Sequence, residues 1–115
     1  MNSLIILILH VFLIMKQNTI IDLLNQVFEI SKKSKHFSID KFDRNLERIS
    51  WLLEQEGYTY KDPTGEEYNE TRMDCQATIL KEDEPYLISE TIKPIIFENK
   101  EGVLTIIQQA RVVIK

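Results

Sequence analysis

The side chains that could do chemistry in this sequence are one cysteine, two histidines and a few neighbouring carboxylates. Cys75 would need a base to act as a nucleophile, but His36 lies in an unrelated segment. We therefore favour a small buried or half-buried thiol over a catalytic one at Cys75. Because the chain has one cysteine, it cannot form an intramolecular disulfide, which is compatible with a reduced, cytoplasmic setting.

The histidines and the neighbouring carboxylates are better explained as ordinary surface residues than as catalytic groups or metal ligands. His10 and His36 do not have the spacing of metal ligands, so we predict no metal site. Asp43 and Glu47 would lie on a charged helix face, and the pair at 66–67 would lie in a turn. Solvated surface charges explain them better than paired acid–base catalysts do. The sequence has no glycine-rich phosphate loop. We expect a protein that is not an enzyme and needs no cofactor.

Length and charge narrow the class of protein. The 115 residues are enough for one small domain, or for a helical arm with a small β unit. Hydrophobic residues make up 43% of the chain, as in folded proteins. The net charge of −4 argues against nucleic acid as the main partner, because phosphate binding favours a basic surface.

The first seventeen residues are predicted to be an apolar extension or the start of a helix. Residues 4–15 are apolar except for His10. About a dozen residues are too few to span a bilayer, which takes roughly 20, and the flanks do not resemble those of a signal peptide. Packing in a core or against a partner helix is the preferred interpretation. One alternative is that the real gene starts at a different position, so that this segment is an odd extension or the result of a truncation. Membrane attachment is the second and less favoured alternative.

Residues 18–57 are predicted to form helices. The segment 19–22 has the form of a capping box and could start or restart a helix at Thr19. Ile20, Leu24 and Val27 then recur at helical spacing, and the basic polar run 31–36 is suited to a helix end.

A second helix is predicted after Ser38, which could cap it, with Asp40 in the first turn. Its apolar positions step by four, three and four along one face. The stripe consists of Phe42, Leu46, Ile49 and Leu53. Trp51 and Leu52 widen the apolar surface further. A short helix with so much apolar area needs an additional partner, so we predict a homodimer joined through a helical bundle.

The segment 57–65 separates the helical half from the strand-forming half. Gly57 is placed to end the helix as a left-handed cap, and Pro63 with Gly65 predicts a tight turn. Residues 58–115 then form a predicted β domain. Its strands are expected at 76–80, 86–97 and 103–114, with a hairpin turn at 99–102. The fold class is α+β, with N-terminal helices followed by a small all-β domain.

Two positions in the β domain need an explanation. Pro94 cannot donate to a strand ladder, so it marks an edge or a bulge. Ile88, Ile92 and Ile96 would share one strand face on either side of it. Gln108 falls on the apolar face of the last strand, so either a bulge turns it outward or it is hydrogen-bonded. That face is formed by Leu104, Ile106, Ala110, Val112 and Ile114.

Four segments resemble the GrpE family of nucleotide exchange factors for DnaK-type chaperones. Residues 62–69, with Asp-Pro-x-Gly-Glu-x-Tyr-Asn, are similar to the opening of the family's β-domain. Residues 107–115 resemble its last strand, and residues 21–30 and 42–57 resemble its helix pair. The resemblance covers about residues 18–115.

This resemblance implies a homodimeric, cytoplasmic co-chaperone whose β-domain contacts the chaperone's ATPase domain and promotes ADP release. The helices would hold the dimer. An adaptor that keeps the fold but has lost exchange activity, or a small membrane-attached interaction protein, are the alternatives. The predicted chaperone contacts are Arg72, Met73, Asp74, Lys93, Pro94, Gln108, Gln109 and Arg111. The family has an arginine where this chain has Gln108, so a charged hydrogen bond would be lost there.

Overall fold

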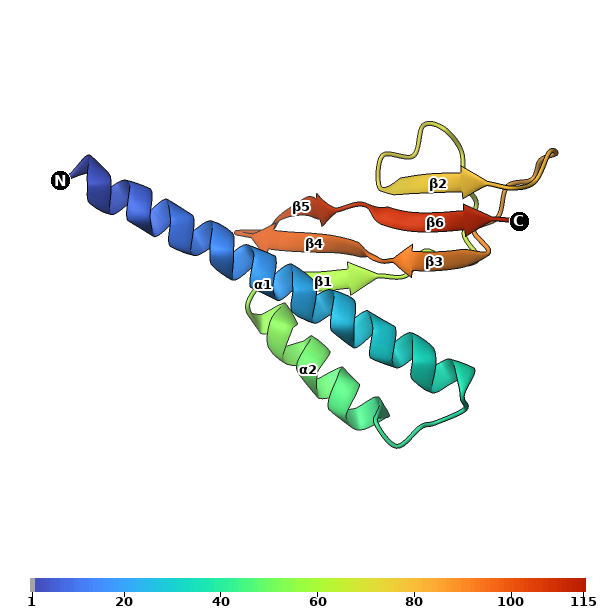
Figure 1. The fold of residues 1–115 in the computed structure, drawn as a ribbon, viewed down its shortest axis with the longest axis horizontal. Helices are drawn as coiled ribbons and strands as arrows, with labels where there is room; N and C mark the ends of the chain where they lie inside the picture. Colours follow the sequence, from blue (N-terminus) through green and yellow to red (C-terminus); the bar gives the residue numbers. More distant parts are fainter. Residues whose placement is uncertain (1) are drawn as a thin grey trace.

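The computed structural model describes residues 2–115, in which two helices precede six short strands (Figure 1). This order confirms the predicted α+β class. The elements are α1 (Ser3–His36), α2 (Asp43–Gln55), β1 (Tyr58–Lys61), β2 (Cys75–Ile79), β3 (Glu90–Lys93), β4 (Ile95–Lys100), β5 (Val103–Gln108) and β6 (Ala110–Ile114).

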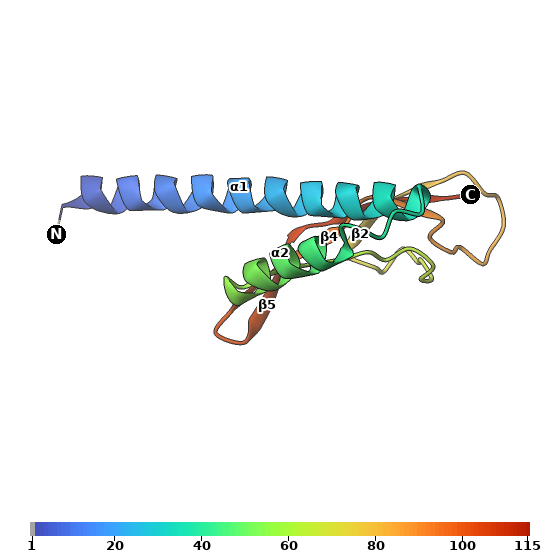
Figure 2. The same cartoon turned by 90° about the horizontal axis from the view of Figure 1, so that it is seen from below.

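Helix α1 is one unbroken helix of 34 residues, and Figure 2 shows it extending straight past the rest of the molecule. The predicted start or restart at Thr19 is therefore wrong. The Thr19 hydroxyl donates to the Met15 carbonyl, 3.1 Å away, instead of capping a new helix. Neither glycine nor proline interrupts residues 3–36, so the helix continues through the capping signal.

Helix α2 begins later than its sequence signals indicate. Ser38 has a φ of 54° and lies in the turn after α1, so its predicted role as a cap is wrong. The residue before the helix is Phe42, and Asp43 is the acidic residue of the first turn. The Asp40 carbonyl accepts a hydrogen bond from the Asp43 amide at 3.2 Å, so Asp40 belongs to the connecting turn.

The helices and the β domain share a core. Ile20 and Leu24 of α1 are buried against Ile96 of β4, as their helical spacing predicts. Val27 and Phe28 are also buried, and the Phe28 ring meets the Tyr60 ring edge-on with centroids 6.0 Å apart. From Ile20 onward α1 is thus packed against the β domain, whereas its first half is not.

The predicted stripe on α2 divides between two surfaces. Leu46 is buried, and Leu53 packs against the cluster that contains Ile20 and Leu24. Phe42 and Ile49 are exposed, as are Trp51 and Leu52. Positions seven apart lie on the same face of a helix, so one face serves this chain's own core and the other is uncovered. The stripe therefore does not form a single dimer surface.

The β domain consists of two three-stranded sheets, ordered β1-β4-β5 and β2-β6-β3. The predicted strand 86–97 is wrong because Pro94 separates β3 from β4, and the chain changes sheets there. The expected irregularity near Pro94 is present as a register shift between Thr91 and Lys93. Ile95 and Ile96 are both buried because they enter different clusters on opposite faces. Ile92 is exposed and does not share their cores.

The predicted strand 103–114 divides in the same way at Gln109. Ala110, Val112 and Ile114 of β6 are buried and alternate as expected, next to the parallel strand β2. Leu104 and Ile106 belong to β5 in the other sheet and are exposed, so their expected burial on the same face is wrong. The predicted hairpin turn lies at 101–102, between β4 and β5.

Of the two explanations predicted for Gln108, a bulge or a hydrogen bond, the structure shows the hydrogen bond. Its side-chain amide donates to the Asn25 oxygen at 2.9 Å and to the Pro94 carbonyl at 2.9 Å. The Asn25 amide donates back to the Gln108 oxygen at 3.0 Å. This pair of amides joins α1 to the point where the chain changes sheets.

We expect Gln108→Ala to lower the free energy of unfolding by about 1–2 kcal/mol, because it leaves the Pro94 carbonyl and the Asn25 amide without partners. Urea unfolding followed by circular dichroism measures the change. Combining Gln108→Ala with Asn25→Ala should cost less than the two single changes added together. Strictly additive losses would show that the two amides do not act as a pair.

Both glycines of the central segment have left-handed backbones. Gly57 follows α2 with a φ of 91°, and a Cβ there would lie 2.7 Å from the Asn99 carbonyl oxygen. Gly65 has a φ of 89° in the turn that Pro63 begins. The predicted cap and turn are thus confirmed. Asp62 fixes the turn further, because its Oδ1 accepts from the Thr64 amide at 3.0 Å.

Candidate functional site

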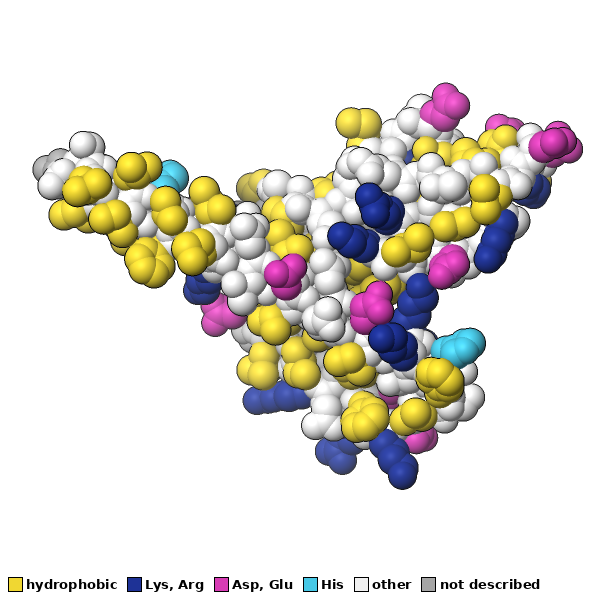
Figure 3. Space-filling view, in the orientation of Figure 1, with side chains coloured by type: hydrophobic (Ala, Val, Ile, Leu, Met, Phe, Trp, Pro, Cys, Tyr) yellow, Lys and Arg dark blue, Asp and Glu magenta, His cyan; other side chains and the backbone are white. Residues whose placement is uncertain are grey.

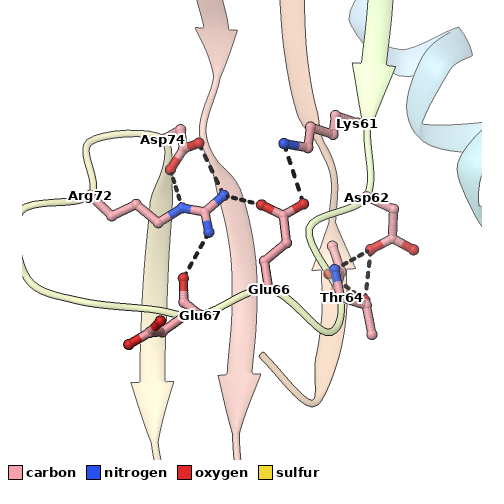
Figure 4. A network of polar contacts seen from close by, with 8 residues as sticks. Lys61, Asp62, Thr64, Glu66, Glu67, Arg72 and Asp74 are labelled. Atoms are coloured by element: carbon pink, nitrogen blue, oxygen red, sulfur yellow. Dashed lines mark hydrogen bonds and ion pairs between the residues drawn. The ribbon is translucent and has the colours of Figure 1, made fainter. Parts of the chain in front are cut away.

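The segment between β1 and β2 is held by one arginine. The Arg72 guanidinium donates from Nε to Asp74 at 2.7 Å and from Nη2 to Glu66 at 2.9 Å (Figure 4). Its third partner is the Glu67 backbone carbonyl, at 3.0 Å. The Arg72 side chain is 15% exposed, so these contacts fasten the loop before β2 onto the turn that follows β1.

Glu66 bridges two cations. One of its oxygens accepts from Arg72, and the other lies 3.3 Å from the Lys61 ammonium (Figure 4). The prediction that Glu66 is a simply solvated turn residue is therefore wrong. Its role escaped sequence analysis because Lys61 and Arg72 lie five and six residues away across a turn, and such spacing does not by itself predict an ion pair.

The surroundings of Asp74 and Cys75 shift the pKa values of both side chains. The hydrogen bond from Arg72 holds the pKa of the Asp74 carboxyl below its ordinary value. Burial raises the pKa of the neighbouring Cys75 thiol to about 11, so Cys75 is neutral at neutral pH. Cys75 is buried in the domain core, as predicted for a structural thiol. Within residues 2–115 no group of three metal-ligating side chains lies together.

The outer face of sheet β2-β6-β3 carries a row of polar side chains. Arg111 of β6 pairs with Gln76 of β2 on one side and with Lys93 of β3 on the other. Directly paired residues point to the same side of a sheet, and all three are exposed. We call these three residues the Arg111 row. Figure 3 shows Lys and Arg side chains over this part of the molecule.

Two further residues extend the Arg111 row at one end. The Gln76 amide donates to the Gln109 oxygen at 2.9 Å, and the Gln109 amide donates to the Met73 carbonyl at 2.7 Å. The Met73 side chain itself is 78% exposed. The surface thus combines two cations, two amides and a flexible thioether. Such groups can donate hydrogen bonds to carboxylates and backbone carbonyls and can bury a small apolar contact.

A hollow of about 320 Å³ borders the Arg111 row where β3 meets α1. Lys93 and Ile92 line it from the sheet, and polar residues of α1 line it from the helix. The helix residues are Asn25, Gln26, Glu29 and Lys33. The row and the hollow therefore form a continuous surface built from both halves of the chain.

The structure separates the residues predicted to contact a chaperone into two groups. Met73, Lys93, Gln109 and Arg111 are exposed and lie on or beside the Arg111 row. Arg72 and Asp74 bind each other, Pro94 is fully buried and Gln108 binds Asn25. The side chains of the second group are buried or partly buried and bonded within the chain, so the first group forms the exposed part of the predicted surface.

Gln76 belongs to this surface but was absent from the predicted contacts. The alternation of strand β2 could have indicated it, because Cys75 and Ala77 face inward and Gln76 lies between them. No family model, curated protein or solved structure matches this chain. The chemistry of the surface and the sequence resemblance are thus the guides to its function.

Proposed function

We propose that this protein is a GrpE-like nucleotide exchange factor that binds the ATPase domain of a DnaK-type chaperone through the Arg111 row. One observation carries the proposal. The two β-domain segments that resemble the family, 62–69 and 107–115, lie far apart in the sequence but meet in one core. Tyr68 packs against the cluster that contains Ala110 and Val112. Two separate likenesses that join in one unit support a common origin better than either one alone.

The composition of the surface suits this role. Arg111 and Lys93 can bind carboxylates of a partner, and the amides of Gln76 and Gln109 can bind its backbone. An exchange factor needs no catalytic group. It binds the open, nucleotide-free chaperone more tightly than the closed, ADP-bound one, and this difference shifts the population towards release.

The uncovered face of α2 supports a homodimer in the same proposal. Phe42, Ile49 and Leu52 are exposed on one side of α2. Trp51 lies on the other side, where it lines a hollow between α2 and α1, so it is not part of this face. Apolar residues gathered on one helix face beside polar neighbours are typical of an interface with another protein. A second copy of α2 is the partner that the proposal assigns to this face.

Calorimetric titration with the cognate ATPase domain tests the docking surface. We expect Arg111→Glu to weaken binding about tenfold or more, because it removes a charged contact and adds a repulsive one. Lys41→Glu is the matched control, since Lys41 is exposed in the turn between the helices and should not affect affinity. Equal losses for both variants would contradict a specific role for the Arg111 row.

The nucleotide dependence is tested in the same titration. Binding should be tighter to the nucleotide-free ATPase domain than to its ADP complex. Equal affinity for both forms would reject exchange activity and leave the adaptor interpretation. The absence of binding to either form would reject both.

A further inference from the structure

The first part of α1 is an apolar arm with no covering in the chain. We define the arm as residues 4–15. Apart from His10, each of its side chains is hydrophobic and between 44% and 66% exposed. Within the described residues, α1 contains the one segment long and apolar enough to cross a membrane, and only 6% of that segment is buried. The arm is thus not covered by the rest of this chain.

The apolar side chains lie on every side of the arm. At 3.6 residues per turn, twelve almost uninterrupted apolar residues leave no polar face. A second copy of the helix would cover one stripe, as in a coiled coil, and the other sides would remain in water. Figure 3 shows hydrophobic side chains along the whole arm. A helix that is apolar all round needs surroundings that are apolar all round.

We propose that the arm inserts into a lipid bilayer and anchors the protein to a membrane surface. Twelve helical residues extend about 18 Å, which is less than the hydrocarbon thickness of about 30 Å, so the arm by itself enters the bilayer without spanning it. His10 is the one polar side chain of the arm, and part of its hydrogen-bonding capacity is used within the helix, because its ring nitrogen Nδ1 lies 3.3 Å from the Ile6 carbonyl oxygen. The unbroken helix places the membrane at a fixed position relative to the β domain.

The base of the arm carries groups suited to lipid headgroups. The apolar run ends at Lys16, which lines a hollow together with Lys100, Glu56 and Glu98. The Gln17 amide donates to Glu98 at 3.2 Å and fixes the arm where it leaves the domain. A lysine at this level can bury its stem while its ammonium reaches phosphate.

The hairpin between β4 and β5 lies at the same end of the domain. Figures 1 and 2 both show its tip on the side from which the arm projects. Val103 and Leu104 at the tip are 65% and 59% exposed. In the proposed orientation these side chains face the membrane surface beside Lys100. The Arg111 row lies on the other sheet, β2-β6-β3, and is not part of this proposed membrane-facing surface.

Vesicle flotation of the full chain tests the proposal. Neutral phosphatidylcholine vesicles and vesicles containing one-quarter phosphatidylglycerol are both used. We expect the protein to float with both, because insertion depends on hydrocarbon and not on headgroup charge. Ile8→Lys combined with Phe12→Lys should reduce the floated fraction by about tenfold or more, since lysine is strongly disfavoured in hydrocarbon.

The matched control is Leu23→Lys combined with Ile30→Lys, which changes two exposed apolar residues of α1 outside the arm. This variant should float like the unchanged protein. Flotation of the arm variant equal to that of the control, or flotation only with anionic vesicles, would overturn insertion. Absence of flotation of the unchanged protein with either kind of vesicle would overturn it as well. These outcomes are independent of chaperone binding, so the two proposals fail separately.

Discussion

Arg72→Ala is expected to lower the free energy of unfolding by about 2–3 kcal/mol. The change removes a nearly buried guanidinium and leaves Glu66 and Asp74 facing each other without their shared cation (Figure 4). Because these carboxylates are partly exposed, the loss should be smaller than for a fully buried pair. Urea unfolding followed by circular dichroism measures it. Arg111→Ala, at an exposed arginine on the neighbouring strand, is the control and should change stability by less than about 0.5 kcal/mol.

The effect of Arg72→Ala should also depend on pH. Arg72 lowers the pKa of Asp74 in the folded chain, so this pairing contributes stability above the ordinary carboxyl pKa. That contribution is lost as the pH falls through the lowered pKa of the folded state. The difference between the unchanged protein and Arg72→Ala should therefore be larger at pH 7 than near pH 3. A difference that stays constant across this range would show that Arg72 acts through packing alone.

Lysine at two positions of α2 is expected to have opposite consequences. Leu46→Lys places a charge at a buried position and should destabilise the fold by about 3 kcal/mol or more. Ile49→Lys changes an exposed residue and should leave the fold intact but separate the proposed dimer. The two residues are three apart on one helix, so each variant is the control for the other.

Circular dichroism measures folding of the α2 variants, and sedimentation equilibrium in density-matched detergent measures their mass. The detergent keeps the apolar arm in solution. A folded Ile49→Lys protein with the same mass as the unchanged dimer would contradict the α2 interface. A fully stable Leu46→Lys protein would contradict the packing of α2 against the core.

Sequence patterns predicted the order of helices and strands because each half has its own hydrophobic period. Ile20, Leu24 and Val27 recur at helical spacing, and Ala110, Val112 and Ile114 alternate as in a strand. The turn glycines were also predictable, since Gly57 and Gly65 stand where a positive φ is required. These signals are local, and the structure follows them.

The changes of sheet at Pro94 and Gln109 were not predictable, because alternation continues across a point where a chain leaves one sheet for another. The contact between Gln108 and Asn25 joins segments far apart in the sequence that only folding brings together. The network around Arg72 is closer in sequence, but it depends on how the turn after β1 and the loop before β2 fold onto each other. For the candidate site, exposed residues such as Lys93 and Arg111 were indicated by resemblance. That these two residues form one surface with Gln76 could be seen only from the structure, because it depends on the register of β2 and β3 against β6.

Release of a fluorescent ADP analogue from the cognate DnaK-type chaperone tests the central proposal most directly. Stopped-flow mixing compares the release rate with and without saturating protein. The account predicts faster release with the unchanged protein and with Lys41→Glu, and a marked loss of acceleration with Arg111→Glu at the same concentration. An unchanged release rate, at concentrations where titration shows the complex to be formed, would contradict exchange activity.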